Sequence, residues 1–224
     1  MNNLDLLKEG ERAILERRFT DAIALMDKAL QQNANDAGAL YLKAQALSNS
    51  DKFNEAIVVF DKLLQMINED PGWQADILIS KSDALIELNK LDEADNSLDN
   101  ALGIKPRLAR GWIHKARIAA RRGNFHKSLE YCERAISVGP NDPRGWNNKA
   151  FALFKLKRYK ECIASAKKAL SIKPDYAQAY IHMANAYNEM GKIRRAKKCE
   201  EEFQKIFKKG GPSLEHTVGH KPMV

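Results

Sequence analysis

A ten-residue pattern recurs six times along the chain, and this periodicity restricts the possible folds more than any other feature. The copies begin at residues 21, 55, 93, 127, 161 and 195, and each has a small residue in second place. Successive starts differ by 34 residues, except for one step of 38 residues between the second and third copies. A unit that recurs at this length predicts an array in which each unit packs only against its neighbours.

Each unit has the pattern of two amphipathic helices. In the fourth unit, apolar residues recur at helical spacing in two blocks, represented by Trp112 and Ala116 and then by Leu129 and Cys132. Gly and Pro mark the turns, and no segment shows the alternation of a strand. The pattern predicts units at 3–36, 37–74, 75–108, 109–142, 143–176 and 177–210, a longer loop near residues 70–73, and a flexible tail at 211–224.

Small residues recur at two positions of the unit, which predicts where its helices cross. Short side chains on both helices permit a close interaxial approach, and a large residue at either position is expected to overpack the crossing. The eighth position holds Gly10, Ala44, Ser82, Ala116, Ala150 and Ala184, and the twentieth holds Ala22, Ala56, Ala94, Ser128, Cys162 and Ala196.

Together with a turn aromatic (Phe19, Phe53, Phe125, Tyr159) and a late Pro in several units, these features resemble the tetratricopeptide repeat. The resemblance covers residues 3–210, although the first two units lack the Pro. It implies an all-α fold, an alpha-alpha superhelix or solenoid of six helix-turn-helix repeats. It also implies a concave surface lined by the second, fifth, ninth and twelfth residues of each first helix.

At those positions, the fourth and fifth units are basic and aromatic. Arginines there are suited to bidentate contacts with carboxylate or phosphate, and the phenylalanines to seating an apolar side chain of the same ligand. The alternative is that the arginines are ordinary solvated surface and the phenylalanines belong to the interhelical core. The candidate partner-binding residues are Arg110, Arg117, Arg121, Arg144, Asn147, Phe151 and Phe154.

The resemblance implies a scaffold or adaptor that binds a peptide, loop or helix of another protein in the concave groove. The basic fourth and fifth units favour acidic segments as ligands. Some members of the family bind the acidic tails of heat-shock chaperones through a set of Lys, Asn and Arg residues. That set is not reproduced, because Gln178 and His182 occupy positions that would hold Lys and Arg. A chaperone-tail adaptor is therefore not predicted.

The sequence predicts no catalytic site, metal site or cofactor. It lacks a Gly-rich phosphate loop, a nucleophile elbow and a His-Glu-x-x-His element. We expect His114 and His182 to cap or pack at helix surfaces, because a zinc site needs three or four converging ligands. His216 and His220 are four residues apart, but Gly219 and the preceding glycines argue against a helix that would align them.

Charge is divided unevenly, and this leaves two alternatives open. Residues 1–108 carry 12 Lys and Arg against 19 Asp and Glu, whereas residues 109–224 carry 25 against 10. The basic half favours nucleic-acid binding, RNA in particular, as a second function. An acidic half and a basic half also favour salt-dependent head-to-tail self-association. The sequence does not fix the oligomeric state.

Composition predicts a cytoplasmic protein without a membrane span. Of its residues, 44% are hydrophobic and 29% charged, as in globular chains, and no apolar run reaches the length of a membrane helix. The first residues include Asp5 and Glu9 in place of the basic and apolar regions of a secretion signal. The three cysteines have neither disulfide-framework nor metal-ligand spacing, so we expect reduced, packed thiols.

Overall fold

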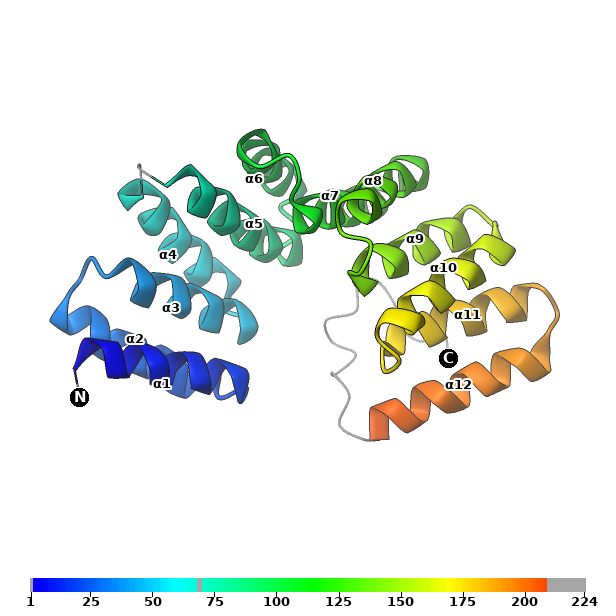
Figure 1. Ribbon diagram of the computed structural model, residues 1–224, viewed down its shortest axis with the longest axis horizontal. Helices are drawn as coiled ribbons and strands as arrows, with labels where there is room; N and C mark the ends of the chain where they lie inside the picture. The colour runs from blue at the N-terminus through cyan, green and yellow to red at the C-terminus, as the bar shows by residue number, and fades with distance from the viewer. Residues whose placement is uncertain (1, 68–69, 209–224) are drawn as a thin grey trace. The chain divides into compact units, whose positions relative to one another are not determined.

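The computed structural model describes residues 2–67 and 70–208, which form twelve α-helices and no strand (Figure 1). The chain divides into two compact units, residues 1–107 and 108–224, and each is described by itself. Unit 1 contains α1 (Asn3–Leu15), α2 (Phe19–Gln32), α3 (Ala37–Asn49), α4 (Phe53–Met66), α5 (Pro71–Glu87) and α6 (Leu91–Ile104). Unit 2 contains α7 (Ala109–Arg121), α8 (Phe125–Val138), α9 (Pro143–Lys155), α10 (Tyr159–Ile172), α11 (Ala177–Glu189) and α12 (Ile193–Lys208).

Consecutive helices pack in pairs, one pair for each repeat, and the small residues lie where the two helices cross. All twelve residues predicted for the crossings are buried. At the crossing of α7 and α8, the hydroxyl of Ser128 donates a hydrogen bond to the carbonyl of Ala116 across 2.9 Å. At the crossing of α1 and α2, a Cβ added to Gly10 would lie 2.3 Å from Cε of Met26. The expected close approach of the paired helices is therefore confirmed.

The turn inside each repeat has the same backbone geometry in all six copies. The fifteenth residue of each repeat has a positive φ, between 58° and 76°, and the set comprises Arg17, Asp51, Asn89, Gly123, Lys157 and Gly191. The amide of the next residue then bonds back to a carbonyl five residues earlier, as from Arg158 to Leu153 across 2.9 Å. This pattern satisfies carbonyls at the end of the first helix and reverses the chain in three residues.

The four-residue excess between the second and third repeats lies in a helix and not in a longer loop, which corrects the expectation. Helix α5 has 17 residues and begins at Pro71. A strict 34-residue period, counted back from the later repeats, would place its first residue at 75. Asp70 caps it by accepting a hydrogen bond from the amide of Trp73 at 2.9 Å. Four residues are close to one helical turn, so the insertion leaves the buried face of α5 in register with the later repeats.

Within each unit, the second helix of one repeat packs against the first helix of the next, and an ion pair recurs there. A lysine at the seventh position of a repeat pairs with the carboxylate at the twenty-fifth position of the repeat before it. The pairs are Lys43 with Asp27 at 2.6 Å, Lys81 with Asp61, and Lys149 with Glu133 at 3.1 Å. We call this contact the inter-repeat pair.

The first and last repeats have polar outer faces. The third and tenth residues of the second repeat, Ala39 and Ala46, are completely buried against the first repeat. The corresponding residues of the first repeat are Asp5 and Arg12, and both are exposed. On the last helix, α12, the outer positions hold exposed Lys197, Glu200, Glu201 and Gln204. Packing of a further repeat on either face would bury charge, so both repeats have the character of caps.

Candidate functional site

The first helices of unit 2 lie side by side, because α9 packs against both α7 and α11 (Figure 1). Their surface away from the second helices is called here the first-helix face of unit 2. The seven residues that the sequence indicated lie on two of these first helices. Arg110, Arg117 and Arg121 are on α7, and Arg144, Asn147, Phe151 and Phe154 are on α9.

An arginine cluster has formed around the carboxylate of Asp142, the N-cap of α9. Asp142 accepts from the backbone amide of Arg144 at 3.0 Å, and both of its oxygens accept from the Arg144 guanidinium, at 3.0 and 2.6 Å. Burial acts to raise the pKa of Asp142. The hydrogen bonds from Arg144 and the charges of Arg144 and Arg110 outweigh burial and lower it. Asp142 therefore stays ionised and brings Arg110 and Arg144 to one place.

Tyr176, the N-cap of α11, connects the third arginine to this cluster. Burial raises the pKa of its phenol, while the charges of Arg144 and Arg117 act to lower it and that of Asp142 to raise it. All three charged groups are thus within electrostatic range of one ring. Arg110 and Arg144 act on Asp142, and Arg117 and Arg144 act on Tyr176, so the three arginines share one electrostatic neighbourhood.

Arg121 does not belong to the cluster. It lies eleven residues beyond Arg110 on α7, which places it about 16 Å farther along the helix axis at 1.5 Å per residue. It is half-buried and has polar interactions of its own. The helix geometry therefore separates Arg121 from Arg110, while Arg117 lies one helical turn from Arg121.

The two phenylalanines have different surroundings. The ring of Phe154 packs against the core of the last two repeats and lies 5.8 Å from the ring of Tyr159. Phe151 is half-buried and bridges three helices, with ring centroids 6.1 Å from Phe125 and 5.7 Å from His182. Phe154 thus contributes to core packing, while Phe151 keeps partial exposure beside the first-helix face.

Asn147 is buried, although its position in the repeat indicated an exposed side chain. Its side chain is 7% exposed, and its Oδ1 has no hydrogen-bond partner. The Nδ2 atom of the neighbouring Asn148 is also buried without a hydrogen-bond partner. A direct contact between Asn147 and a ligand would therefore require its side chain to move.

Asp142 and Tyr176 were not identified from the sequence as parts of the site. The motif Asn141-Asp142-Pro143-Arg144 contains the signal for one of them, because an Asp before a Pro at the first helical position is a helix N-cap. An arginine two residues later is then within reach of the same carboxylate. No comparable signal marks Tyr176, whose place in the cluster depends on how α9 and α11 pack.

Unit 1 has an open groove of about 780 Å³ between α1 and α2. Its lining includes Glu9, Lys28 and the paired side chains of Arg18 and Asp21, whose nearest charged atoms are 2.6 Å apart. An ion pair on its wall and a wide opening make this groove a polar surface feature, and it has no converging anchor residues.

Residues 2–67 and 70–208 contain no group of three or more His, Cys, Asp or Glu side chains arranged to hold a metal ion. His114 and His182 are 3% and 6% exposed, so they lie inside the helix packing and not at the surface where they were expected. His216 and His220 lie outside the described residues, as does the tail predicted for 211–224.

Cys132, Cys162 and Cys199 are buried free thiols. Within the part of the chain that the structure describes, no helix combines the length and the apolar character needed to cross a bilayer.

Family models of the tetratricopeptide repeat match the chain at residues 13–75, 79–143, 143–176 and 177–208. The human protein O-mannosyl-transferase TMTC1 is 33% identical over 97 residues. That match covers 43% of this chain but 10% of the human protein.

Two solved structures show the likeness in fold. TTC0263, a thermophilic tetratricopeptide-repeat protein of Thermus thermophilus, has a TM-score of 0.71 and 21% identity, over 83% of this chain and 98% of that one. YrrB, a tetratricopeptide-repeat protein with an unusual peptide-binding site, has a TM-score of 0.55 and 17% identity, over 81% of this chain and 91% of that one. At these identities the likeness is one of fold.

Proposed function

We propose, from the premise that the chain belongs to the tetratricopeptide-repeat family, that it binds an acidic peptide segment of another protein on the first-helix face of unit 2. Proteins of this family are generally scaffolds for protein–protein interaction and are typically non-catalytic. YrrB, which shares the fold, has a peptide-binding site. We accordingly assign the chain a binding role and no enzymatic one.

The observation that carries this proposal is the grouping of arginines around two neighbouring residues: Arg144 and Arg110 act on the carboxylate of Asp142, and Arg144 and Arg117 act on the phenol of Tyr176. We expect these arginines to attract a carboxylate of the ligand. Arg144 already presents its guanidinium edge to a carboxylate in bidentate geometry. A ligand carboxylate can share or replace that contact.

The arginines alone supply little affinity, because an exposed ion pair is worth about 0.2–1 kcal/mol. Specific binding therefore needs an apolar anchor near the charge, and Phe151 is the partly exposed ring on the same helix as Arg144. We infer a ligand with one or more acidic residues followed or preceded by a large apolar side chain. Phe154 and Asn147 support the face from within the packing, and Arg121 serves contacts farther along α7.

A labelled short peptide of Glu, Ser and one Phe, and the same peptide with Gln in place of Glu, test the proposal by fluorescence anisotropy. Arg110→Glu with Arg144→Glu should weaken binding of the acidic peptide at least tenfold. Lys8→Glu with Lys28→Glu makes the same change in net charge on unit 1, where both lysines are exposed, and should leave binding unchanged.

Asp142→Asn should strengthen binding of the acidic peptide, whereas the arginine substitutions weaken it. Asn caps helices as well as Asp does, so α9 should remain intact while the competing carboxylate is removed. We expect the acidic peptide to bind about twofold to fivefold more tightly, the effect of one exposed ion pair. Equal binding of the Glu and Gln peptides, or no response to the arginine substitutions, would refute the acidic-ligand assignment.

We also propose that the protein works in the cytoplasm. Cys132, Cys162 and Cys199 are free, although oxidising compartments favour disulfides in small proteins. Localisation of the tagged full chain by cell fractionation tests this, and recovery with a secreted or luminal fraction would contradict it.

A further inference from the structure

Two types of ion pair recur from repeat to repeat. They distinguish the surface charges that stabilise the repeats from charges that have no such role. One is the inter-repeat pair between the seventh and twenty-fifth positions. The other, called here the turn pair, joins a basic residue at the sixteenth position to an acidic residue at the nineteenth. The turn pairs are Arg18 with Asp21 at 2.6 Å, Lys52 with Glu55 at 4.0 Å, Lys90 with Glu93 at 3.8 Å, and Arg158 with Glu161 at 2.7 Å.

Two of these contacts are lost at the end of the array, namely the inter-repeat pair between the fifth and sixth repeats and the turn pair of the sixth repeat. The twenty-fifth position of the fifth repeat is Lys167, where the first, second and fourth repeats have Asp27, Asp61 and Glu133. Its counterpart at the seventh position of the sixth repeat is Met183 instead of a lysine. The nineteenth position of the sixth repeat is Arg195, where every other repeat except the fourth, which has Lys127, has an acidic residue. These two basic residues therefore have no part in the packing scheme that the other repeats use.

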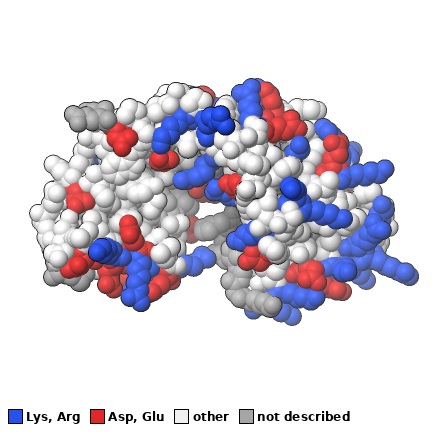
Figure 2. Space-filling model, viewed as in Figure 1, with Lys and Arg blue, Asp and Glu red and all other residues white. Residues whose placement is uncertain are grey.

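Lys167 and Arg195 belong to a larger group of exposed cations, which we call the basic patch. The patch is positioned by α10 and α12, and blue side chains gather over this part of unit 2 in Figure 2. None of its members forms an ion pair with another described residue. Its members are Lys167, Lys168, Arg194, Arg195, Lys197 and Lys198.

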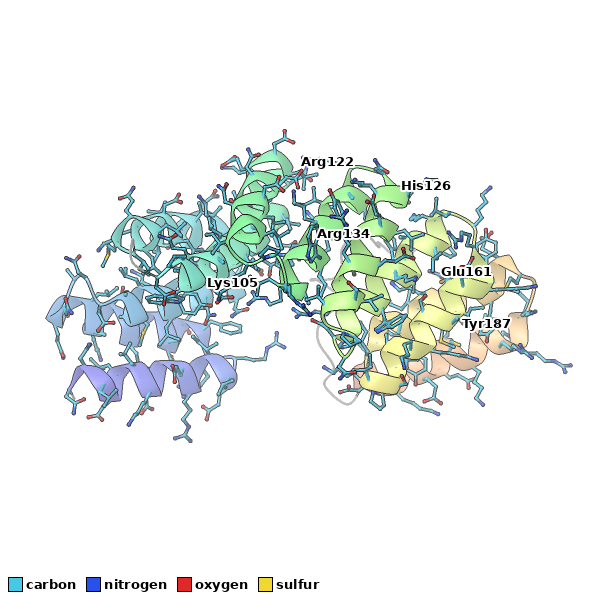
Figure 3. All side chains as sticks on the ribbon, turned by 45° about the horizontal axis from the view of Figure 1, so that its top comes forward. Lys105, Arg122, His126, Arg134, Glu161 and Tyr187 are labelled. Carbon is cyan, nitrogen blue, oxygen red and sulfur yellow. The ribbon has the colours of Figure 1, made fainter. Side chains whose placement is uncertain are left out.

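One lysine of each helix acts on the same thiol group. Burial raises the pKa of the Cys199 thiol on α12, and the charges of Lys167 and Lys198 both act to lower it. Lys167 of α10 and Lys198 of α12 are thus both within electrostatic range of one sulfur atom. Arg195 lies with its guanidinium 5.8 Å from the ring centroid of Tyr187, which is labelled in Figure 3.

We propose that the basic patch binds the phosphodiester backbone of a nucleic acid. Four of its six members are lysines, whose ammonium groups act as point charges on flexible stems and suit a repeating row of phosphates. All six members are basic, and the exposed Ile193 precedes Arg194 on α12. The patch therefore recognises charge spacing and not base sequence.

Neutralisation of phosphates has a measurable consequence. Six contacts to a single strand give a slope of about −4 for the logarithm of the binding constant against the logarithm of salt concentration. Single-stranded RNA, single-stranded DNA and duplex DNA all offer this backbone. Separate binding curves for the three, measured with labelled oligonucleotides of about 20 residues, show which of them the patch prefers.

The decisive variant is Lys167→Glu with Arg195→Glu in the full chain. Both substitutions install the acidic type that other repeats have at these positions, so the fold should tolerate them. We expect binding of labelled RNA to weaken at least tenfold at about 150 mM salt, and the salt slope to fall by about two. A second variant, Lys168→Gln with Lys197→Gln, removes two charges without reversing them and should show a smaller loss in the same direction.

Lys8→Glu with Lys28→Glu is the matched control, because it changes the net charge of the chain by the same amount on unit 1. It should bind RNA within twofold of the unaltered protein. Arg110→Glu with Arg144→Glu should also keep RNA binding, so this proposal and the acidic-peptide proposal can fail separately.

Absence of RNA and DNA binding at about 150 mM salt would overturn the proposal. Equal losses in the patch variant and in the unit 1 control would also overturn it, because net charge would then explain the binding. Binding to phosphatidylserine vesicles or to polyglutamate without binding to nucleic acid would assign the patch to a lipid or protein partner instead.

Discussion

The residue with a positive φ in the turn of every repeat gives a stability prediction. Substitutions at this position should change the free energy of unfolding in opposite directions, depending on whether glycine is removed or introduced. Gly123 and Lys157 occupy the same position of neighbouring repeats, with φ of 76° and 60°. Glycine adopts this region without penalty, whereas a residue with a Cβ is strained there by about 1–2 kcal/mol. Gly123→Ala should therefore destabilise the protein, and Lys157→Gly should stabilise it.

The size of each effect follows from two opposing contributions. A Cβ placed on Gly123 meets no atom within 4 Å, so packing adds nothing to the backbone strain. Alanine also restricts the unfolded chain, which offsets about 0.4–1 kcal/mol of that strain. The net loss for Gly123→Ala is about 1 kcal/mol, and the gain for Lys157→Gly is about 0.5–1 kcal/mol. Asn89→Gly should change stability by only a few tenths of a kcal/mol, because Asn tolerates this conformation.

Urea unfolding of the full chain measures these differences. The midpoint should move down for Gly123→Ala and up for Lys157→Gly at constant slope, since the surface exposed on unfolding is unchanged. Circular dichroism and the fluorescence of Trp112 and Trp146 should give the same midpoint if unit 2 unfolds cooperatively. An unchanged midpoint for Gly123→Ala would refute the account of the turn.

The remaining predictions concern packing, titration and assembly. Ala150→Leu should overpack a helix crossing and lower the free energy of unfolding by about 1–3 kcal/mol, and an unchanged melting temperature would remove that assignment. Burial raises the pKa of Cys132 and of Cys162 to about 12, from 9.0, so the folded state keeps protons that the unfolded state releases. Stability should accordingly fall as the pH rises from 9 toward 12. A chain with both cysteines changed to Ala should show a smaller slope in urea titrations, while Cys199 and Tyr176, whose pKa values are also raised, keep part of it. For assembly, head-to-tail stacking would place Glu9 of one copy, at the lysine position of the inter-repeat pair, against Glu201 of another. We expect one sedimentation coefficient at about 50 mM and about 500 mM salt, and a larger species at low salt would contradict this.

The fold was predictable from the sequence because its determinants are local and repeated six times. A small residue such as Ala116 has the same packing requirement in every copy, so periodicity alone identified the crossings. The prediction of a loop for the four-residue insertion before residue 75 was wrong, because it assumed that every first helix begins at the same position of the 34-residue repeat. The Asp70-Pro71 cap and first turn in the sequence favoured an added turn of helix instead.

The candidate site was only partly predictable, because it depends on contacts between helices that are not neighbours in sequence. Repeat position identified Arg110 and Arg144, but it did not show that Asp142 holds them together. It also treated Asn147 as exposed, although the fifth position is buried or half-buried in every repeat. The packing of α7 and α11 against α9 decides that question, and no single repeat contains this information.

The same reasoning explains why net charge alone could not identify a binding surface. Residues 109–224 carry 25 basic and 10 acidic side chains, but a lysine such as Lys149 is already paired with Glu133 between repeats. Only comparison of equivalent positions separates charges that hold repeats together from charges that have no such use. Lys167 differs from its acidic counterparts, and Met183 differs from their lysine partners, so both halves of one inter-repeat pair have changed together. A change in both halves of the contact removes its structural role without leaving a buried charge unpaired, and it leaves Lys167 exposed for contact with a phosphate.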